Sequence, residues 1–185
     1  MVLLIRRGLA CAGIIGVFAA CGGSGEAAAA GDGVPKLKVP GDTGAPVYRT
    51  KAGAIGVAIC YDRHYPEYMR ALALGGAELV VVPQAGAIDE WPEGLYEGEM
   101  RVAAFQHGYF VALCNRVGVE DCLTFGGESF VCAPDGRVLA RAPKLEDALL
   151  VVDLDLSDAA ASHARRLFLQ HRRPELYADW LRIAR

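Results

Sequence analysis

A thiol, a guanidinium and an imidazole lie within one short polar turn, at Cys60, Arg63 and His64. Cationic groups and a nearby helix N-terminus favour the thiolate form of a cysteine, which is the nucleophile in cysteine chemistry. Cysteine is also among the most buried residue types and often packs as a small apolar side chain. The sequence of this turn is therefore consistent with either a catalytic or a structural role for Cys60. His64 could pair with Cys60, orient a substrate, or serve only in packing.

The segments on either side of this turn are expected to be a strand and a helix. Residues 54–59 are apolar and alternate between branched and small side chains, so a helix or second sheet could approach the small face closely. Pro66 suits the first position of the following helix, and Glu67 complements the dipole in its first turn. Strand, turn and helix together would present Cys60 at the strand's end.

The remaining chain alternates between strand and helix patterns, which is typical of an α/β protein. We expect further strands at 78–82, 109–114, 129–133, 137–140 and 149–154, and helices at 66–74, 95–107 and from 158. Pro83 is expected to end its strand, the turn at 134–136 to form a hairpin, and Ser157 to cap the last helix. Along the second helix, Glu97 and Glu99 are expected on a solvated face, and His107 at the helix end is expected to meet the dipole as a cation.

Residues 1–39 are expected to be a signal-like or non-homologous segment and linker. Arg6 and Arg7 precede an apolar stretch, and the residues up to Cys21 are similar to the box cleaved before the lipid-modified cysteine of bacterial lipoproteins. Cys21 would then carry a lipid anchor, and a flexible tether would follow it. The alternative is a chance sequence produced by a shifted reading frame. The apolar stretch is short for a membrane-spanning helix.

Composition limits the classes of partner. The 185 residues are 53% apolar and 22% charged, which is enough to fill one domain core, and the net charge of −3 gives no reason to expect nucleic acid. The six cysteines show no zinc-ligand spacing. We expect them to be reduced thiols of a cytosolic protein, which counts against export.

The stretch GAIGVAICYDRHYPEYMRALALGGAELVVVPQ, at 53–84, resembles the nitrilase superfamily of carbon–nitrogen hydrolases around its nucleophilic cysteine. The resemblance continues in family order through PGDTGAPVY, GYFVALCNRVGVE, TFGGESFVCAPDGRVLA and HRRPELY. It is nearest to the N-carbamoyl amide hydrolases, the beta-ureidopropionase and N-carbamoylputrescine amidase group. It implies a partial αββα sandwich over residues 40–185 that lacks roughly the N-terminal half. Val57, Ile59 and residues 80–82 would then lie under incomplete cover.

The resemblance also assigns roles to residues of the turn. Cys60 would be the nucleophile, the backbone N–H of Tyr61 would hold the oxyanion, Arg63 would face a substrate carboxylate and His64 would contact substrate. Asn115 and Arg116 would be structural. No metal or organic cofactor is implied. The family is cytoplasmic and its intact members form homo-oligomers, whereas a true signal segment would make this chain a membrane-tethered lipoprotein.

The family's catalytic glutamate and lysine have no matching motif in this sequence. The segment before Pro40 offers only Glu26, Lys36 and Lys38, outside any family motif. The expected function is hydrolysis of a non-peptide amide or N-carbamoyl small molecule through a cysteine thioester, in a truncated and impaired form. The alternative is a catalytically incompetent fragment with a structural or partner-binding role.

Overall fold

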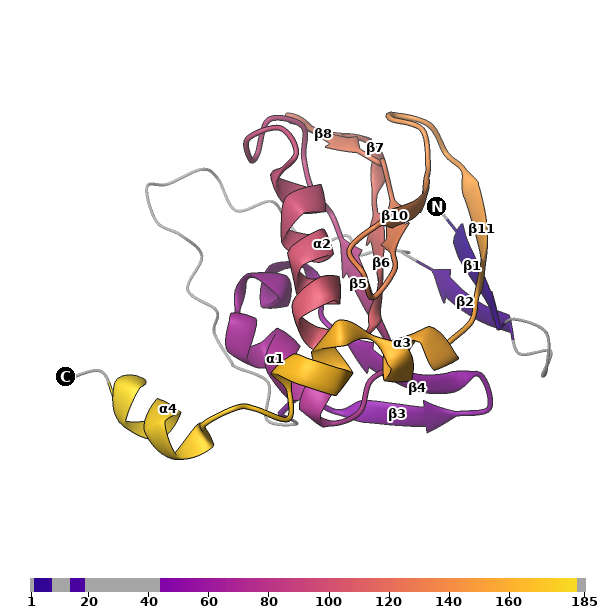
Figure 1. Ribbon diagram of the computed structural model, residues 1–185. Helices are drawn as coiled ribbons and strands as arrows, with labels where there is room; N and C mark the ends of the chain where they lie inside the picture. Colours follow the sequence, from indigo (N-terminus) through magenta and orange to yellow (C-terminus); the bar gives the residue numbers. More distant parts are fainter. Residues whose placement is uncertain (1, 8–13, 19–43, 183–185) are drawn as a thin grey trace.

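A computed structural model describes residues 44–182 in full, and residues 2–7 and 14–18 as strands. Its elements alternate between strand and helix for most of the chain (Figure 1). The strands are β1 (Val2–Arg7), β2 (Ile14–Phe18), β3 (Val47–Thr50), β4 (Gly53–Val57), β5 (Leu79–Gln84), β6 (Phe110–Asn115), β7 (Val117–Glu120), β8 (Leu123–Gly126), β9 (Phe130–Cys132), β10 (Val138–Arg141) and β11 (Leu149–Leu154). The helices are α1 (Pro66–Leu74), α2 (Leu95–His107), α3 (Ser157–Ala161) and α4 (Pro174–Trp180), with a 3₁₀ turn at Cys60–His64 and a π turn at Ala164–Phe168.

A six-stranded sheet in the order β10-β9-β6-β5-β4-β3 forms the centre of the molecule. Its three middle strands, β4, β5 and β6, run parallel, and β3 and β9 pair antiparallel at either side of them. The carboxyl ends of the parallel strands therefore meet at one edge of the sheet. Ligands commonly bind at this edge in α/β sheets.

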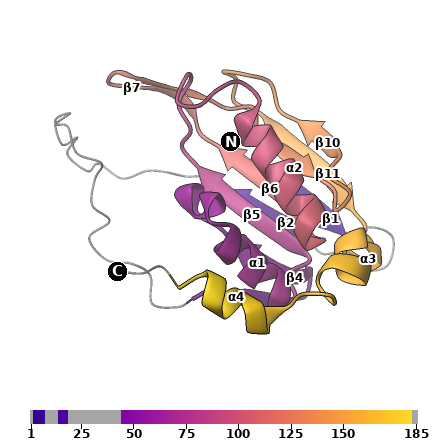
Figure 2. The same cartoon turned by 60° about the vertical axis from the view of Figure 1, so that its left-hand side comes forward.

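Helices α1 and α2 cover one face of this sheet (Figure 2). The expected close approach is confirmed at Gly56, where a Cβ atom would lie 3.1 Å from a methyl of Leu72 and 3.3 Å from Val80. The core on this side is fully buried. It contains Ala58, Met69, Leu72, Val80, Val82, Met100, Tyr109, Val111 and Leu113.

The opposite face is covered by a second sheet with the order β11-β1-β2 (Figure 1). Strand β11 contributes Val152 and Leu154 to a core that also contains Leu79 and Phe110. The expectation of incomplete cover is therefore wrong for residues 80–82, which are buried. Val57 is partly buried and packs against this core, and the expectation is confirmed only at Ile59, which is 61% exposed.

Strand β5 differs from expectation because it runs through Pro83 to Gln84. Val81 accepts its hydrogen bond from the Ala58 N–H, on the side of β4, while Gln84 accepts from Arg116 on the other side. The backbone nitrogen of Pro83 faces the same side of β5 as the Val81 backbone, where β4 has already ended. The missing N–H of Pro83 therefore leaves no carbonyl of β4 without a partner.

Two smaller expectations at loops also need correction. Ser157 is the first residue of α3 and makes no capping bond to the helix; its N–H and hydroxyl donate to the Asp155 carboxylate. The β7–β8 hairpin has no counterpart among the expected elements. The expected Pro66 start and Gly75 end of α1, the limits of α2, and the β9–β10 hairpin are confirmed.

The segment expected as a signal or linker contains β1 and β2, which pair with each other, while β1 pairs parallel with β11. Cys21, the following tether, Glu26, Lys36 and Lys38 lie outside the described residues. The division of the chain at residue 39 and the lipid anchor stay predictions. Among the described residues, no helix has the length and apolar character needed to cross a membrane.

Candidate active site

Cys60 occupies a strained backbone position just past the end of β4. Its φ is +48°, in the left-handed region that side chains other than glycine rarely adopt. Such a conformation costs about 1 kcal/mol or more, and it persists where the surrounding structure enforces it, often at functional sites. The residue is half-buried and its thiol is free. Tyr61 follows as the second residue of the helical turn, a position where a backbone N–H has no partner inside the helix.

Asp62 closes the turn that carries Cys60. Its carboxylate accepts a hydrogen bond of 2.9 Å from the Ile59 N–H, and its own N–H donates to the Ile59 carbonyl at 3.0 Å. A short polar side chain that bonds nearby backbone is the usual way to stabilise such a turn. Asp62 therefore acts here through the backbone.

Arg63 lies beneath the turn and is only 4% exposed. Its Nε donates to Glu99 at 3.1 Å, and one terminal nitrogen donates to the Cys60 carbonyl at 2.9 Å. The guanidinium also lies 4.7 Å from the centre of the Tyr96 ring. The role of Arg63 in binding a substrate carboxylate stays a prediction, since protein groups already engage its guanidinium.

His64 is held by the same glutamate. Its Nδ1 lies 2.7 Å from the second carboxylate oxygen of Glu99, and its ring packs against Tyr61 and Trp91. Its Nε2 is buried without a hydrogen-bond partner among the described residues. Cys60 and His64 therefore form no hydrogen-bonded dyad in this structure.

Glu99 is the site residue that sequence reasoning missed. We expected it on a solvated helix face, but its carboxylate joins Arg63 and His64 and is three-quarters buried. Nothing in the local pattern of α2 distinguishes Glu99 from Glu97, which pairs with Arg101 and Arg141. Only the packing of α2 against the Cys60 turn reveals the difference.

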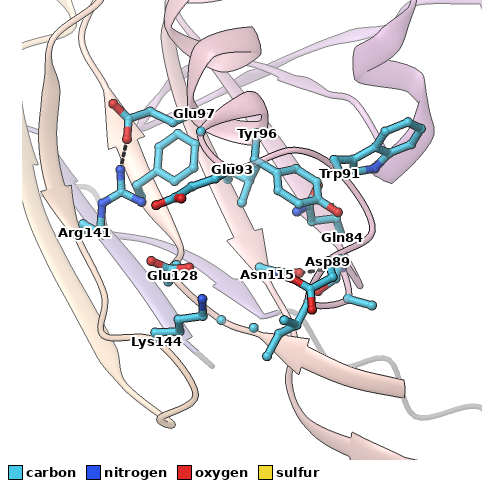
Figure 3. A pocket seen from close by; sticks show the side chains of 18 of the residues that line it. Gln84, Asp89, Trp91, Glu93, Tyr96, Glu97, Asn115, Glu128, Arg141 and Lys144 are labelled. Carbon is cyan, nitrogen blue, oxygen red and sulfur yellow. Dashed lines mark hydrogen bonds and ion pairs between the residues drawn. The ribbon is translucent and has the colours of Figure 1, made fainter. Parts of the chain in front are cut away.

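A cavity of about 480 Å³ lies at the carboxyl ends of β5 and β6 (Figure 3). Gln84 and Asn115 line it from these strand ends, and Trp91 and Tyr96 form the wall that adjoins the Cys60 turn. Cys60 itself does not line the cavity. The β4–β5 register pairs Val57 with Val81, so Cys60 and Gln84 each follow the last pair by three residues.

Hydrogen bonds fix one wall of this cavity. The Asn115 side chain accepts from the Gly86 N–H at 2.7 Å and donates to the Gly86 carbonyl at 3.2 Å, which agrees with the structural role expected for it. The Tyr96 hydroxyl donates to Glu90 at 2.7 Å. Burial and this bond raise the pKa of Tyr96, so its hydroxyl stays protonated.

Two other thiols can be compared with Cys60. Cys114 and Cys132 are buried in strands β6 and β9, and burial raises the pKa of each to about 12. A thiol with that pKa has almost no thiolate near neutral pH. Burial therefore disfavours both residues as nucleophiles in the folded protein.

The carbon-nitrogen hydrolase family model matches residues 25–164, and the chain belongs to this family. The match begins upstream of Pro40, where the family-like sequence was expected to start. The observed mixed α/β sheet with its covering helices agrees with a partial nitrilase-type fold.

Individual relatives narrow the comparison. Beta-ureidopropionase of Arabidopsis thaliana is 37% identical over 157 residues, covering 76% of this chain and 38% of the relative. N-carbamoylputrescine amidase of Solanum tuberosum is 36% identical over 151 residues, covering 75% and 50%. The solved structure of a mutant of the amidase from Nesterenkonia sp. AN1 has a TM-score of 0.65 and 38% identity, covering 77% of this chain and 50% of that one, and it shows the acetamide moiety of fluoroacetamide added covalently at the active-site cysteine. The chain thus spans about half the length of the relatives it matches, or less.

Proposed function

We propose that this chain is a carbon–nitrogen hydrolase that acts on a non-peptide amide or N-carbamoyl small molecule through a thioester on Cys60. The observation that carries the proposal is the placement of Cys60. It is a half-exposed thiol in left-handed backbone at the carboxyl end of a parallel strand, and the N–H of Tyr61 follows it. The covalent adduct on the active-site cysteine of the Nesterenkonia amidase supports the same role for a cysteine in this family.

The reaction would proceed in two steps. The Cys60 sulfur gives up its proton and attacks the carbonyl carbon, and the Tyr61 N–H stabilises the negative charge on the oxygen. The carbon–nitrogen bond then breaks, ammonia leaves with the added proton, and a thioester remains. Water hydrolyses the thioester and restores the thiol.

The polar groups beside Cys60 would serve substrate binding in different ways. Because Glu99 holds Nδ1 of His64, the imidazole ring is fixed beside the turn that carries Cys60, and a contact between His64 and the substrate is part of this proposal. Arg63 can support the reaction from its observed position, since its hydrogen bond to the Cys60 carbonyl stabilises the turn that presents the thiol.

Ammonia release and adduct formation test this proposal together. The chain is incubated with N-carbamoyl-β-alanine and with small aliphatic amides, and intact mass spectrometry follows fluoroacetamide labelling of the same samples. We expect slow ammonia release, because the family's glutamate and lysine are not identified in this sequence and catalytic groups act as a unit. Labelling and release should both disappear in Cys60→Ala and persist in Cys122→Ala, which removes an exposed thiol elsewhere.

The alternative of an incompetent fragment gives a different result. A fragment with only a structural or partner-binding role would release no ammonia, and its labelling would be spread over Cys60 and Cys122 without preference. Assembly into homo-oligomers and the cellular location stay predictions. Light scattering coupled to size-exclusion chromatography measures the first of them.

A further inference from the structure

A groove of about 630 Å³ lies between α1 and α4, which lie side by side at the surface of the molecule (Figure 2). This α1–α4 groove shares no lining residue with the cavity at the ends of β5 and β6, and Cys60 does not line it. Sites for small molecules have volumes of about 300–1,000 Å³ and are mostly apolar, with a few polar groups that orient the ligand. The groove has both properties, and the proposed hydrolysis gives it no role.

Apolar side chains form most of the wall of the α1–α4 groove. Leu74, the last residue of α1, is 50% exposed, and Trp180, the last residue of α4, is 69% exposed. Phe168 of the π turn lines the same groove. A hydrocarbon group that covers these side chains removes apolar surface from water, which favours its binding.

Two arginines give the groove a positive charge. Arg70 and Arg172 line it, both are half-buried, and neither forms an ion pair among the described residues. The Arg172 guanidinium lies 5.7 Å from the centre of the Tyr177 ring, which provides a cation–π contact but no counter-charge. Burial and the nearby Arg172 lower the pKa of Arg70, because no anion stabilises its charged form.

The acidic and imidazole groups of the groove leave this positive charge in excess. Within the part of the chain that the structure describes, Glu67 is the one carboxylate that lines the groove, and it forms no ion pair with Arg70. His107 belongs to the buried wall, and burial lowers its pKa to about 4, so it is neutral near pH 7. Two guanidinium groups and one carboxylate therefore match a ligand with a single negative charge.

We propose that the α1–α4 groove binds a monocarboxylate with a hydrocarbon body, its carboxylate at Arg70 and Arg172 and its chain along Leu74 and Trp180. A guanidinium presents its N–H donors in a planar fork that matches the two oxygens of a carboxylate. A dianion such as phosphate would exceed the charge of the groove and leave the apolar wall uncovered. The groove is thus a ligand site separate from Cys60.

Eight-carbon compounds that differ only in their head group test the inference. Octanoate, octanol and octylammonium are titrated calorimetrically into the full chain. We expect octanoate to bind roughly tenfold more tightly than octanol, and octylammonium to bind more weakly than either. Each CH₂ group removed from octanoate, down to butanoate, should weaken binding roughly twofold, since an open groove covers only part of each group.

Trp180 reports whether the ligand occupies this groove. The sequence has two tryptophans, Trp91 and Trp180, so Trp91→Phe leaves Trp180 as the single fluorophore of this type. Octanoate should shift its emission to shorter wavelength, because the hydrocarbon chain displaces water from an indole that is 69% exposed in the free protein. Calorimetry on the unmodified chain measures the affinity independently of this variant.

Variants of the groove separate the charged contact from the apolar one. Arg70→Gln and Arg172→Gln should each weaken octanoate roughly fivefold and leave octanol unchanged, and Glu67→Gln should strengthen octanoate roughly twofold. Leu74→Ala should weaken octanoate and octanol alike. Arg166→Gln removes the same charge from an exposed residue outside the groove and should alter neither, and thermal melting checks that each variant is folded.

Four results would overturn the inference. Three of them are equal affinity for octanoate and octanol, normal octanoate binding by the double variant of Arg70 and Arg172, and calorimetric binding without a change in Trp180 emission. The fourth is a second copy of the chain in the groove, which light scattering would show as a dimer that binds no octanoate. Release of ammonia has no bearing on any of these results, because Cys60 takes no part in the groove.

Discussion

Removal of the Glu99 carboxylate should destabilise the protein far more than removal of its neighbour on the same helix. The Arg63 side chain is 2% exposed and that of Glu99 is 25% exposed. Glu99→Ala would remove two charge-assisted hydrogen bonds and leave a buried guanidinium with one remaining bond, to the Cys60 carbonyl. Breaking a buried ion pair from one side costs about 3–5 kcal/mol, and the partial exposure of Glu99 reduces this to about 2–3 kcal/mol.

Glu97→Ala is the matched control for this change. Glu97 also accepts from two arginines, but Arg101 and Arg141 are partly exposed and can bind water instead. Ion pairs of that kind contribute up to about 1 kcal/mol. Urea unfolding of both variants measures the difference in the free energy of unfolding. Thermal melting should show a fall in Tm of about 5–10 °C for Glu99→Ala.

A double variant identifies the cause of the loss. Arg63→Met with Glu99→Leu removes both charges, so it should recover much of the stability lost in Glu99→Ala. If Glu99→Ala were no less stable than Glu97→Ala, or if the double variant were less stable than Glu99→Ala, the buried pair would not hold the turn as described.

Three further results follow from buried groups. Cys114 and Cys132 should resist iodoacetamide at neutral pH until the protein unfolds, whereas Cys60 should react in the folded state. Peptide mass spectrometry measures this order, and labelling of Cys132 before Cys60 would count against Cys60 as the nucleophile. Burial lowers the pKa of His107 from 6.5 to about 4, so the unfolded state takes up a proton at higher pH than the folded state does. The free energy of unfolding should therefore fall by up to about 3 kcal/mol as the pH drops from 6.5 to 4. His107→Phe should flatten that pH dependence in urea titrations. Arg165 donates hydrogen bonds to three backbone carbonyls, at the ends of α1 and α2 and before β5. Arg165→Met should therefore lower the free energy of unfolding by about 3 kcal/mol. A loss under about 1 kcal/mol would show that water replaces these bonds.

The parts of the fold that follow local periodicity could be predicted from the sequence. The alternation of branched and small residues at 54–59 identified β4 and its close-packed face, and Pro66 and Gly75 marked the ends of α1. Helix α2 was predicted at about 95–107, and the structure gives it these bounds. The family could also be recognised, since the segment around Cys60 is contiguous in sequence.

The parts that depend on tertiary contacts could not be predicted. Glu99 has no sequence signal, because its role arises only when α2 packs beside the Cys60 turn. His107 was expected to be a cation at a helix end, but burial keeps its pKa near 4 and therefore keeps it neutral. The strand β1 was missed for a similar reason, since its partner β11 lies at the other end of the chain.

The pairing of β1 with β11 has a consequence for how the chain folds. The register joins Val2 to Leu149, so the second sheet closes a loop that contains the whole Cys60 region. Contacts between such distant segments form late and slow the folding of a domain, because the entropy of the intervening loop opposes them. During synthesis from the ribosome, the sheet face around Leu79 and Phe110 would wait uncovered until β11 emerged. This interval is when the chain would depend most on chaperones.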